Sequence, residues 1–257
     1  MVKSGGNHMD YFYETVETIT EGVGFSHFDT CHFIWLAGFI LFTCLCCILY
    51  KKSSPNRRKT IRWIFVAMLF ANELYKIIGL VAYDNYIPKY LPLQLCSINI
   101  FVIAAHAFKP SKAIGNFLYA ICIPGALAAL VFPSWTELPA YNFMHIHSFT
   151  IHIMLAAYPI MLTAGGDIKP NIGQIPKCLA LLVGMAIPVY FVNLKFDTNF
   201  MFLMQADVGN PLMWFENAFG NHLIGYPILA IPILIVLYFP VWINNRKKLA
   251  TYASPQC

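Results

Sequence analysis

Charged residues are scarce in this 257-residue chain, of which they form 11%, whereas hydrophobic residues form 58%. The mean hydropathy is +0.60. Soluble domains ordinarily carry about 25% charged residues, because their surfaces must be solvated by water. The composition therefore excludes a soluble enzyme or binding domain and indicates an integral membrane protein.

Two sequence patterns are also missing, that of a metal site and that of a disulfide-stabilised domain. The cysteines and histidines do not have the spacing of a zinc site, so we predict neither a metal centre nor a cofactor. The eight cysteines do not form a disulfide pattern either, because most of them lie inside apolar runs. A free thiol in such a run behaves as a small apolar side chain.

Apolar runs long enough to cross a bilayer occur about seven times. We therefore predict an all-α, polytopic membrane protein in which residues 31–243 form the transmembrane domain. Residues 1–30 form an N-terminal extracytoplasmic segment whose weak amphipathic pattern suggests a short interfacial helix or a lid, and residues 244–257 form a basic cytoplasmic tail. The predicted spans are Cys31–Tyr50, Thr60–Val81, Leu91–His106, Gly115–Phe132, Met144–Thr163, Pro176–Asn193 and His222–Ile243.

Basic residues gather in alternate connections, which orients the chain. Short cytoplasmic loops carry the excess of lysine and arginine. We therefore place the N-terminus outside the cytoplasm and the C-terminus inside it. The membrane is predicted to be either a bacterial cell membrane or a eukaryotic endomembrane. The net charge of +5 is then explained by basic residues that anchor the cytoplasmic ends of the spans at the membrane surface. It does not indicate a nucleic-acid partner. The residues are Lys51, Lys52, Arg57, Arg58, Lys59, Lys109, Lys112, Lys169, Lys177, Arg246, Lys247 and Lys248.

Polar side chains inside a span face the protein interior or a water-filled cavity, because hydrocarbon offers them no partner. The third span brings Cys96 and Asn99 to one helix face. In the second span, Glu73 and Lys76 are i,i+3 neighbours and can form an ion pair. That pair either ties helices together or contacts a headgroup or a functional side chain.

The fifth span contains a group of histidines. His145, Ser148 and His152 form one stripe along the helix, whereas His147 points away. At ~1.5 Å per residue, Cys96 and His152 lie roughly 8 and 12 Å below the outer interface, so the two can meet. A histidine beside a cysteine can take its proton and activate it as a nucleophile.

The longest connection, residues 194–221, mixes apolar, aromatic and amide side chains, as a segment capping the outer side of the bundle does. Asn193 and Asn199 could donate hydrogen bonds to an oxyanion. They are equally suited to cap helices and turns, which we favour.

Several segments recur together in a family pattern. They are Leu91-Pro92-Leu93-Gln94-Leu95-Cys96-Ser97, Phe149-Thr150-Ile151-His152 with Tyr158-Pro159 and Gly165-Gly166, then Asn193, Thr198-Asn199-Phe200-Met201-Phe202-Leu203 and a proline-rich last span. This order resembles the YwaF-like family, which includes the eukaryotic transmembrane protein 164. The resemblance implies a membrane acyltransferase that moves a fatty acyl chain from a diacyl phospholipid to a lyso-ether phospholipid.

By position in the family motif, the nucleophile would be Cys96 and the histidine His152. Gln94 stands where a histidine is common in the family, so His145 and His147 remain alternative bases. The partners implied are a phospholipid, a lysophospholipid and the membrane itself, while the oligomeric state is left open.

Our leading hypothesis is that Cys96, deprotonated by His152, forms an acyl-thioester that a lysophospholipid hydroxyl then resolves. One alternative is a non-enzymatic seven-helix receptor or transporter with a proton-sensing histidine stripe. Another is a lipid hydrolase that uses the same two residues. Candidates for binding or orienting the substrate are Asn99, His145, Ser148, Asn193 and Asn199.

Overall fold

A computed structural model describes residues 11–206 and 211–253, with side chains described as far as residue 243. Within this part, seven helical stretches are long and apolar enough to span a membrane, and no strand is present. This confirms the predicted all-α, seven-span architecture. The orientation of the termini stays a prediction, and residues 1–10 and 254–257 lie outside the described part.

The α-helices are α1 (Thr30–Lys52), α2 (Pro55–Ala82), α3 (Leu95–Phe108), α4 (Lys112–Phe117), α5 (Ile123–Val131), α6 (Phe143–Ala164), α7 (Ile175–Phe196), α8 (Leu212–Phe219) and α9 (Gly225–Ala253). Short turns of tighter or wider helix are η1 (Pro88–Tyr90), η2 (Leu118–Cys122), η3 (Ile172–Gln174), η4 (Phe200–Phe202) and η5 (His222–Ile224).

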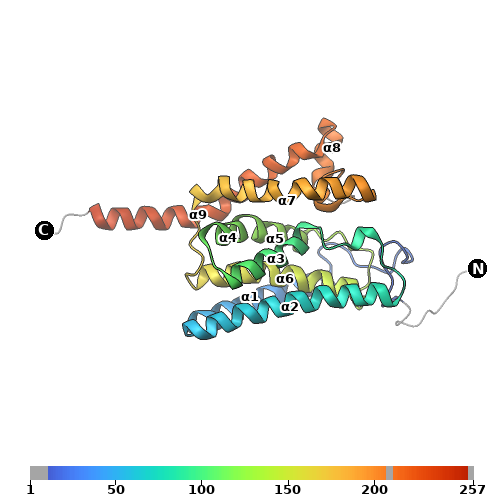
Figure 1. Ribbon diagram of the computed structural model, residues 1–257, viewed down its shortest axis with the longest axis horizontal. Coiled ribbons are helices and arrows are strands. Elements are labelled where there is room, and N and C mark those ends of the chain that lie inside the picture. Colours follow the sequence, from blue (N-terminus) through green and yellow to red (C-terminus); the bar gives the residue numbers. More distant parts are fainter. Residues whose placement is uncertain (1–10, 207–210, 254–257) are drawn as a thin grey trace, which may run out of the picture.

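Helix α6 forms the centre of the bundle, where it contacts α1, α2, α3 and α5. Figure 1 shows it among these helices, with α1 and α2 on one side and α4 and α5 on the other. Most of its side chains are buried. The close approach of α2 depends on Gly79, because a Cβ there would lie 2.5 Å from the Phe143 ring. Helix α6, which carries His145, His147 and His152, is therefore enclosed by other parts of the protein.

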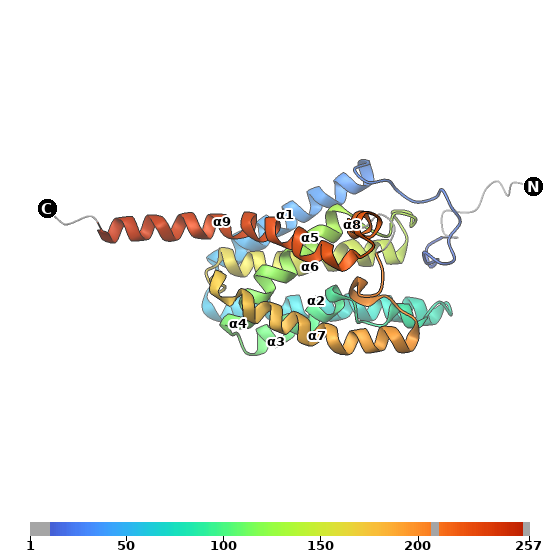
Figure 2. The same cartoon turned by 90° about the horizontal axis from the view of Figure 1, so that it is seen from above.

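Helices α7 and α9 lie on the side of α4 and α5 that faces away from α1 and α2 (Figure 1). Their side chains are mostly exposed, as expected for helices that face lipid. A hydrogen bond of 2.6 Å from the Tyr119 hydroxyl to the Leu237 carbonyl joins η2 to α9. Figure 2 shows the C-terminal part of α9 extending beyond the other helices.

The third span differs from its prediction at its outer end. Helix α3 begins at Leu95, with Gln94 as its N-cap, rather than at Leu91. Pro92 lies in the turn before the helix instead of in its first turn. The reason is that the Gln94 side chain accepts a hydrogen bond from the Met201 amide at 2.8 Å, which fixes an extended backbone at residue 94. Cys96 is consequently the second residue of the helix.

Residues 11–29 contain turns and no helix, which corrects the interfacial helix suggested by their pattern. Their backbone groups bond to the start of α6 as well as to one another. Asn142 donates to the carbonyls of Tyr11 and Glu14, and the Phe143 amide donates to the Phe12 carbonyl. The segment is thus attached to the outer end of the central helix.

Candidate functional site

The start of α3 is fixed by the segment that follows α7. Besides the bond from Met201 to Gln94, Leu95 and its neighbours pack against Phe200 and Met201. Cys96 is partly buried at this end of the helix, and the backbone amide and hydroxyl of Ser97 approach its thiol. The first turn of a helix has free N–H groups and a positive dipole end, so it favours an anionic sulfur.

An ion pair lies beside this thiol. Lys76 bonds to the carboxylate of Glu73 one turn earlier on α2, which confirms the predicted i,i+3 pair. The two side chains are only 8% and 10% exposed. Both are close enough to Cys96 to interact electrostatically with it. The structure therefore places a thiol next to two opposite charges inside the membrane.

His147, which lies on α6, belongs to the same group of polar residues. Its Nδ1 lies 3.1 Å from the Asn72 carbonyl, and its Nε2 lies 3.9 Å from Glu73 Oε2. That carboxylate oxygen is buried and has no hydrogen-bond partner among the described residues. His147 is also close enough to interact with Lys76 and with His152. It points away from the stripe, as predicted, and faces the charges of α2.

His152 is held in a defined orientation. Its Nδ1 lies 2.6 Å from the Ser148 carbonyl, and its ring stacks on Trp135 with centroids 5.4 Å apart and planes inclined by 9°. A carbonyl only accepts hydrogen bonds, so Nδ1 carries the proton. The lone pair is therefore on Nε2, which is the state that a general base requires.

His145 has both ring nitrogens engaged. Its Nδ1 lies 3.2 Å from the Leu138 carbonyl, while its Nε2 accepts from the Trp35 indole at 2.9 Å and lies 3.9 Å from the Cys31 sulfur. A ring bonded on both sides holds helices together and has no free lone pair. His145 is accordingly the least suited of the three histidines to act as a base.

Cys96 and His152 lie on neighbouring elements without a hydrogen bond between them in the described structure. Cys122 of η2 lies next to Cys96 and donates to the Leu155 carbonyl of α6 at 3.4 Å. The predicted nucleophile and base are thus joined through α3, η2 and α6. Catalytic hydrogen bonds are often long or absent before substrate binds, so in the proposed mechanism a direct contact between these two side chains has to form with the substrate in place.

Of the predicted amides, Asn193 is structural. Its Oδ1 accepts from Thr198 and from the Phe200 amide, and its Nδ2 donates to the Phe200 carbonyl at 3.0 Å. Asn199 bonds in the same way to the turn that ends at Gln205. These bonds support the capping role that we favoured. Asn99 differs, because it is buried and its Oδ1 has no hydrogen-bond partner within the described chain.

A groove of about 340 Å³ runs between α2 and α3. Among the described residues that line it, Glu73 alone is charged, and the others are Phe70, Ala71, Leu74, Ile77, Pro92, Ile100 and Phe101. Phe101 and Leu74 are among the exposed apolar side chains that a bilayer would cover. The groove therefore links the lipid-facing surface to the Glu73–Lys76 pair.

Two contributors to this site were not singled out from the sequence. Trp135, which supports the His152 ring, lies in the connection between α5 and α6, and its single position in a loop gave no signal. The contact of Glu73 with both His147 and the groove depends on how α2 packs against α6. Among the described residues, no three metal-binding side chains are grouped to hold an ion.

Comparison with known families accounts for most of the chain. The model of the TMEM164 family matches residues 26–242, which include all seven candidate spans apart from the last residue of the seventh. No curated protein and no solved structure matches the chain.

Proposed function

Because the chain belongs to the TMEM164 family, we propose that this multi-pass membrane protein is a phospholipid acyltransferase with Cys96 as nucleophile and His152 as general base. The family resemblance suggests the activity, and the site gives it a physical basis. The main support is the His152 ring, whose Nδ1 is bonded to the Ser148 carbonyl so that Nε2 is left as an acceptor.

In the first half-reaction, Nε2 of His152 takes the thiol proton and the Cys96 sulfur attacks the ester carbonyl of a diacyl phospholipid. The ester C–O bond breaks, the leaving alkoxide takes the proton from the imidazolium, and a lysophospholipid departs. The acyl group is then held on Cys96 as a thioester. The first turn of α3 and the positive charge of Lys76 would favour the sulfur anion, against the opposing effects of burial and of the Glu73 carboxylate.

In the second half-reaction, Nε2 takes the hydroxyl proton of an acceptor lysophospholipid, whose oxygen attacks the thioester. The C–S bond breaks, the new ester leaves, and Cys96 recovers its proton. A thioester inside the bilayer is shielded from water, which favours transfer over hydrolysis. The groove between α2 and α3 would take the acyl chain, and Asn99 and Ser148 are candidates to orient the reacting groups.

The decisive experiment traps the intermediate. Purified protein in nanodiscs is given a diacyl phospholipid with a radiolabelled acyl chain and no acceptor. We expect hydroxylamine-sensitive label on Cys96, absent in Cys96→Ala and retained in the matched variant Cys122→Ala, which removes the neighbouring buried thiol. Full transfer by Cys96→Ala without any bound label would exclude the mechanism.

Adding lysophospholipid separates the remaining possibilities. A transferase passes the label to the lysophospholipid, whereas a hydrolase releases labelled fatty acid whether or not the acceptor is present. A receptor or transporter would show no label, together with pH-dependent binding or flux that survives Cys96→Ala.

A further inference from the structure

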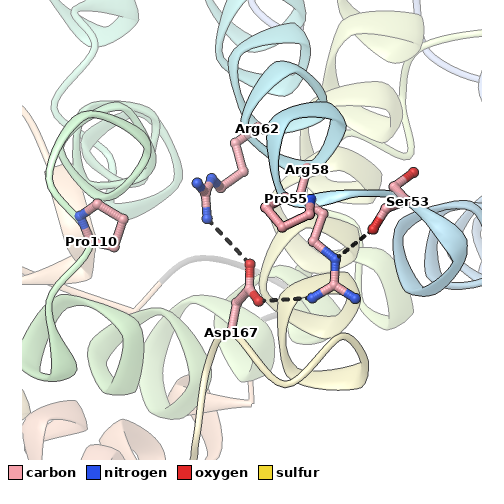
Figure 3. A pocket seen from close by; sticks show the side chains of 6 residues that line it. All are labelled: Ser53, Pro55, Arg58, Arg62, Pro110 and Asp167. Atoms are coloured by element: carbon pink, nitrogen blue, oxygen red, sulfur yellow. Dashed lines mark hydrogen bonds and ion pairs between the residues drawn. The ribbon is translucent and has the colours of Figure 1, made fainter.

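A pocket of about 520 Å³ opens at the end of the bundle opposite the start of α3, where α2 begins and α6 ends (Figure 3). The loop charges predict that this end faces the cytoplasm. The residues that line the pocket are Ser53, Pro55, Arg58, Arg62, Pro110 and Asp167. It therefore joins the α1–α2 turn, the α3–α4 turn and the turn after α6.

Arg58 is committed to the fold. It donates to the carbonyls of Gly165, Ser53 and Lys51 at 2.9, 3.2 and 3.3 Å, and to Asp167 at 3.0 Å. With four acceptors around one guanidinium, it locks the two turns together. It has little hydrogen-bonding capacity left for a ligand.

Arg62 is different, because its single hydrogen bond to the described protein runs from Nη1 to Asp167 at 3.2 Å. Its Nε is buried and has no partner among the described residues, and the side chain is only 16% exposed. Native proteins seldom leave a buried donor unpaired, so this Nε is suited to an anionic acceptor. The Nε and Nη2 edge of a guanidinium is a planar fork that matches phosphate oxygens.

The charge balance favours an anion. Asp167 already accepts from Arg58 and Arg62, and from the Tyr50 hydroxyl at 2.5 Å. Two arginines against one aspartate leave one positive charge in the pocket. Figure 3 shows the Arg62 guanidinium between Pro110 and Asp167, while the Arg58 guanidinium lies beside Ser53.

We propose that this pocket binds a phosphate group through Arg62, either from a lipid headgroup of the adjoining leaflet or from a soluble phosphate. Arg62 would keep Asp167 through Nη1 and present Nε and Nη2 to the phosphate after a rotation of its side chain. Arg58 and Asp167 hold the surrounding turns and shape the pocket. The site is independent of acyl transfer, because it uses none of the residues around Cys96.

The experiment measures phosphate binding by two routes. Detergent-solubilised protein is titrated with inorganic phosphate against chloride at equal ionic strength, with the unfolding temperature as readout. In parallel, protein in phosphatidylcholine nanodiscs with and without phosphatidic acid is analysed for retained lipid. Binding in the first arm identifies a free phosphate as sufficient, and binding in the second arm alone identifies a lipid headgroup.

We expect Arg62→Gln to weaken binding about tenfold or more in whichever arm shows it, since it removes charged hydrogen bonds. Arg57→Gln is the matched control, because Arg57 is exposed near the start of the same helix and outside the pocket. An equal loss in both variants would mean general surface attraction and would overturn the site. Absence of binding in both arms would do the same.

A second variant covers the case in which Arg62→Gln does not fold. Arg62→Lys keeps the charge and removes the planar fork, so binding should weaken several-fold relative to Arg57→Lys. Wild-type affinity in Arg62→Lys would overturn the role of the fork.

Discussion

Two groups of charged residues lie at the two ends of α2, the inner one including Asp167 from the turn after α6, and they differ in how far protein encloses them. Near the outer end, Glu73 and Lys76 are 10% and 8% exposed, and one carboxylate oxygen has no hydrogen-bond partner in the described structure. At the inner end, Arg58 and Asp167 are 22% and 25% exposed, and each makes several hydrogen bonds. In the described structure the inner group fastens turns together through Arg58 and Asp167 and has its unpaired donor at Arg62 Nε, whereas the outer group leaves a carboxylate oxygen unpaired.

This difference identifies which charged residues of a membrane protein call for a functional explanation. Removing an ion from water costs several kcal/mol, and a nearby opposite charge offsets that only in good geometry. Charges at the interface carry little of this penalty. The Glu73–Lys76 pair, with His147 facing it and the Cys96 thiol beside it, is thus a candidate for function because of its position.

The largest expected effect is on catalysis at the outer site. His152→Ala should lower the proposed acyl transfer by roughly 10²–10⁴-fold, because it removes the proposed general base. The readout is transfer to lysophospholipid in nanodiscs, with His27→Ala as the control since His27 is exposed and lies before α1. Near wild-type transfer by His152→Ala would assign the proton to another group, of which His147 is the first candidate.

The next largest effect is on stability at the same end. Lys76→Met should lower the free energy of unfolding by about 3–5 kcal/mol, because it leaves the Glu73 carboxylate buried without its partner. The double variant Glu73→Gln with Lys76→Met should recover most of that loss. Denaturation in mild detergent measures both. A Lys76→Met protein as stable as the wild type would show that water reaches this pair.

The inner group should lose less stability than the outer group when its ion pairs are broken. Asp167→Asn removes the charge that Arg58 and Arg62 share, and we expect a loss of about 1.5–3 kcal/mol, the range for hydrogen bonds to charged groups. The same denaturation assay applies. A loss equal to that of Lys76→Met would remove the distinction between the two ends of α2.

The smallest effect comes from a pair outside the membrane. Burial raises the pKa of Glu17, but hydrogen bonds from Lys89 and Tyr90 outweigh it and hold this pKa below its ordinary value of 4.5. The pair therefore contributes stability above that pH, and the contribution is lost as the pH falls through the folded-state pKa. Since Lys89 is 62% exposed, it amounts to less than about 1 kcal/mol.

Hydrogen exchange of residues 11–29 measures this last effect, after correction for the intrinsic effect of pH on exchange. Exchange should rise as Glu17 becomes protonated, and Glu17→Gln should exchange at the faster rate throughout. A pH response that persists in Glu17→Gln would assign the titration to another group. Asp29, whose pKa is lowered by bonds from the amides of His32 and Ser26, is the nearest candidate.

Hydropathy and local spacing predicted the parts of this protein that depend on one helix at a time. The seven spans follow from run length, the Glu73–Lys76 pair from i,i+3 spacing, and the direction of His147, away from the stripe, from helical periodicity. The start of α3 differs from its prediction because Gln94 bonds to Met201, about a hundred residues later in the chain. Such a contact has no local signature.

The hydrogen bonding of the histidine rings could not be predicted from the sequence, for a related reason. The stripe fixed which rings share a face, but the bond of each ring nitrogen depends on neighbouring helices and loops. His145 is occupied by Trp35 and Leu138, whereas His152 is supported by Trp135 and keeps Nε2 as an acceptor. The activity itself, with Cys96 and His152 in their proposed roles, stays a prediction until the intermediate is trapped.

If the proposed acyl transfer draws its lipid through the groove between α2 and α3, the rate has a particular dependence on the bilayer. A lipid that enters from the side travels within the leaflet, so its supply is set by its mole fraction in the bilayer and not by its bulk concentration. Diluting the substrate with inert phospholipid at constant total substrate should slow the protein, while adding water should leave its rate unchanged.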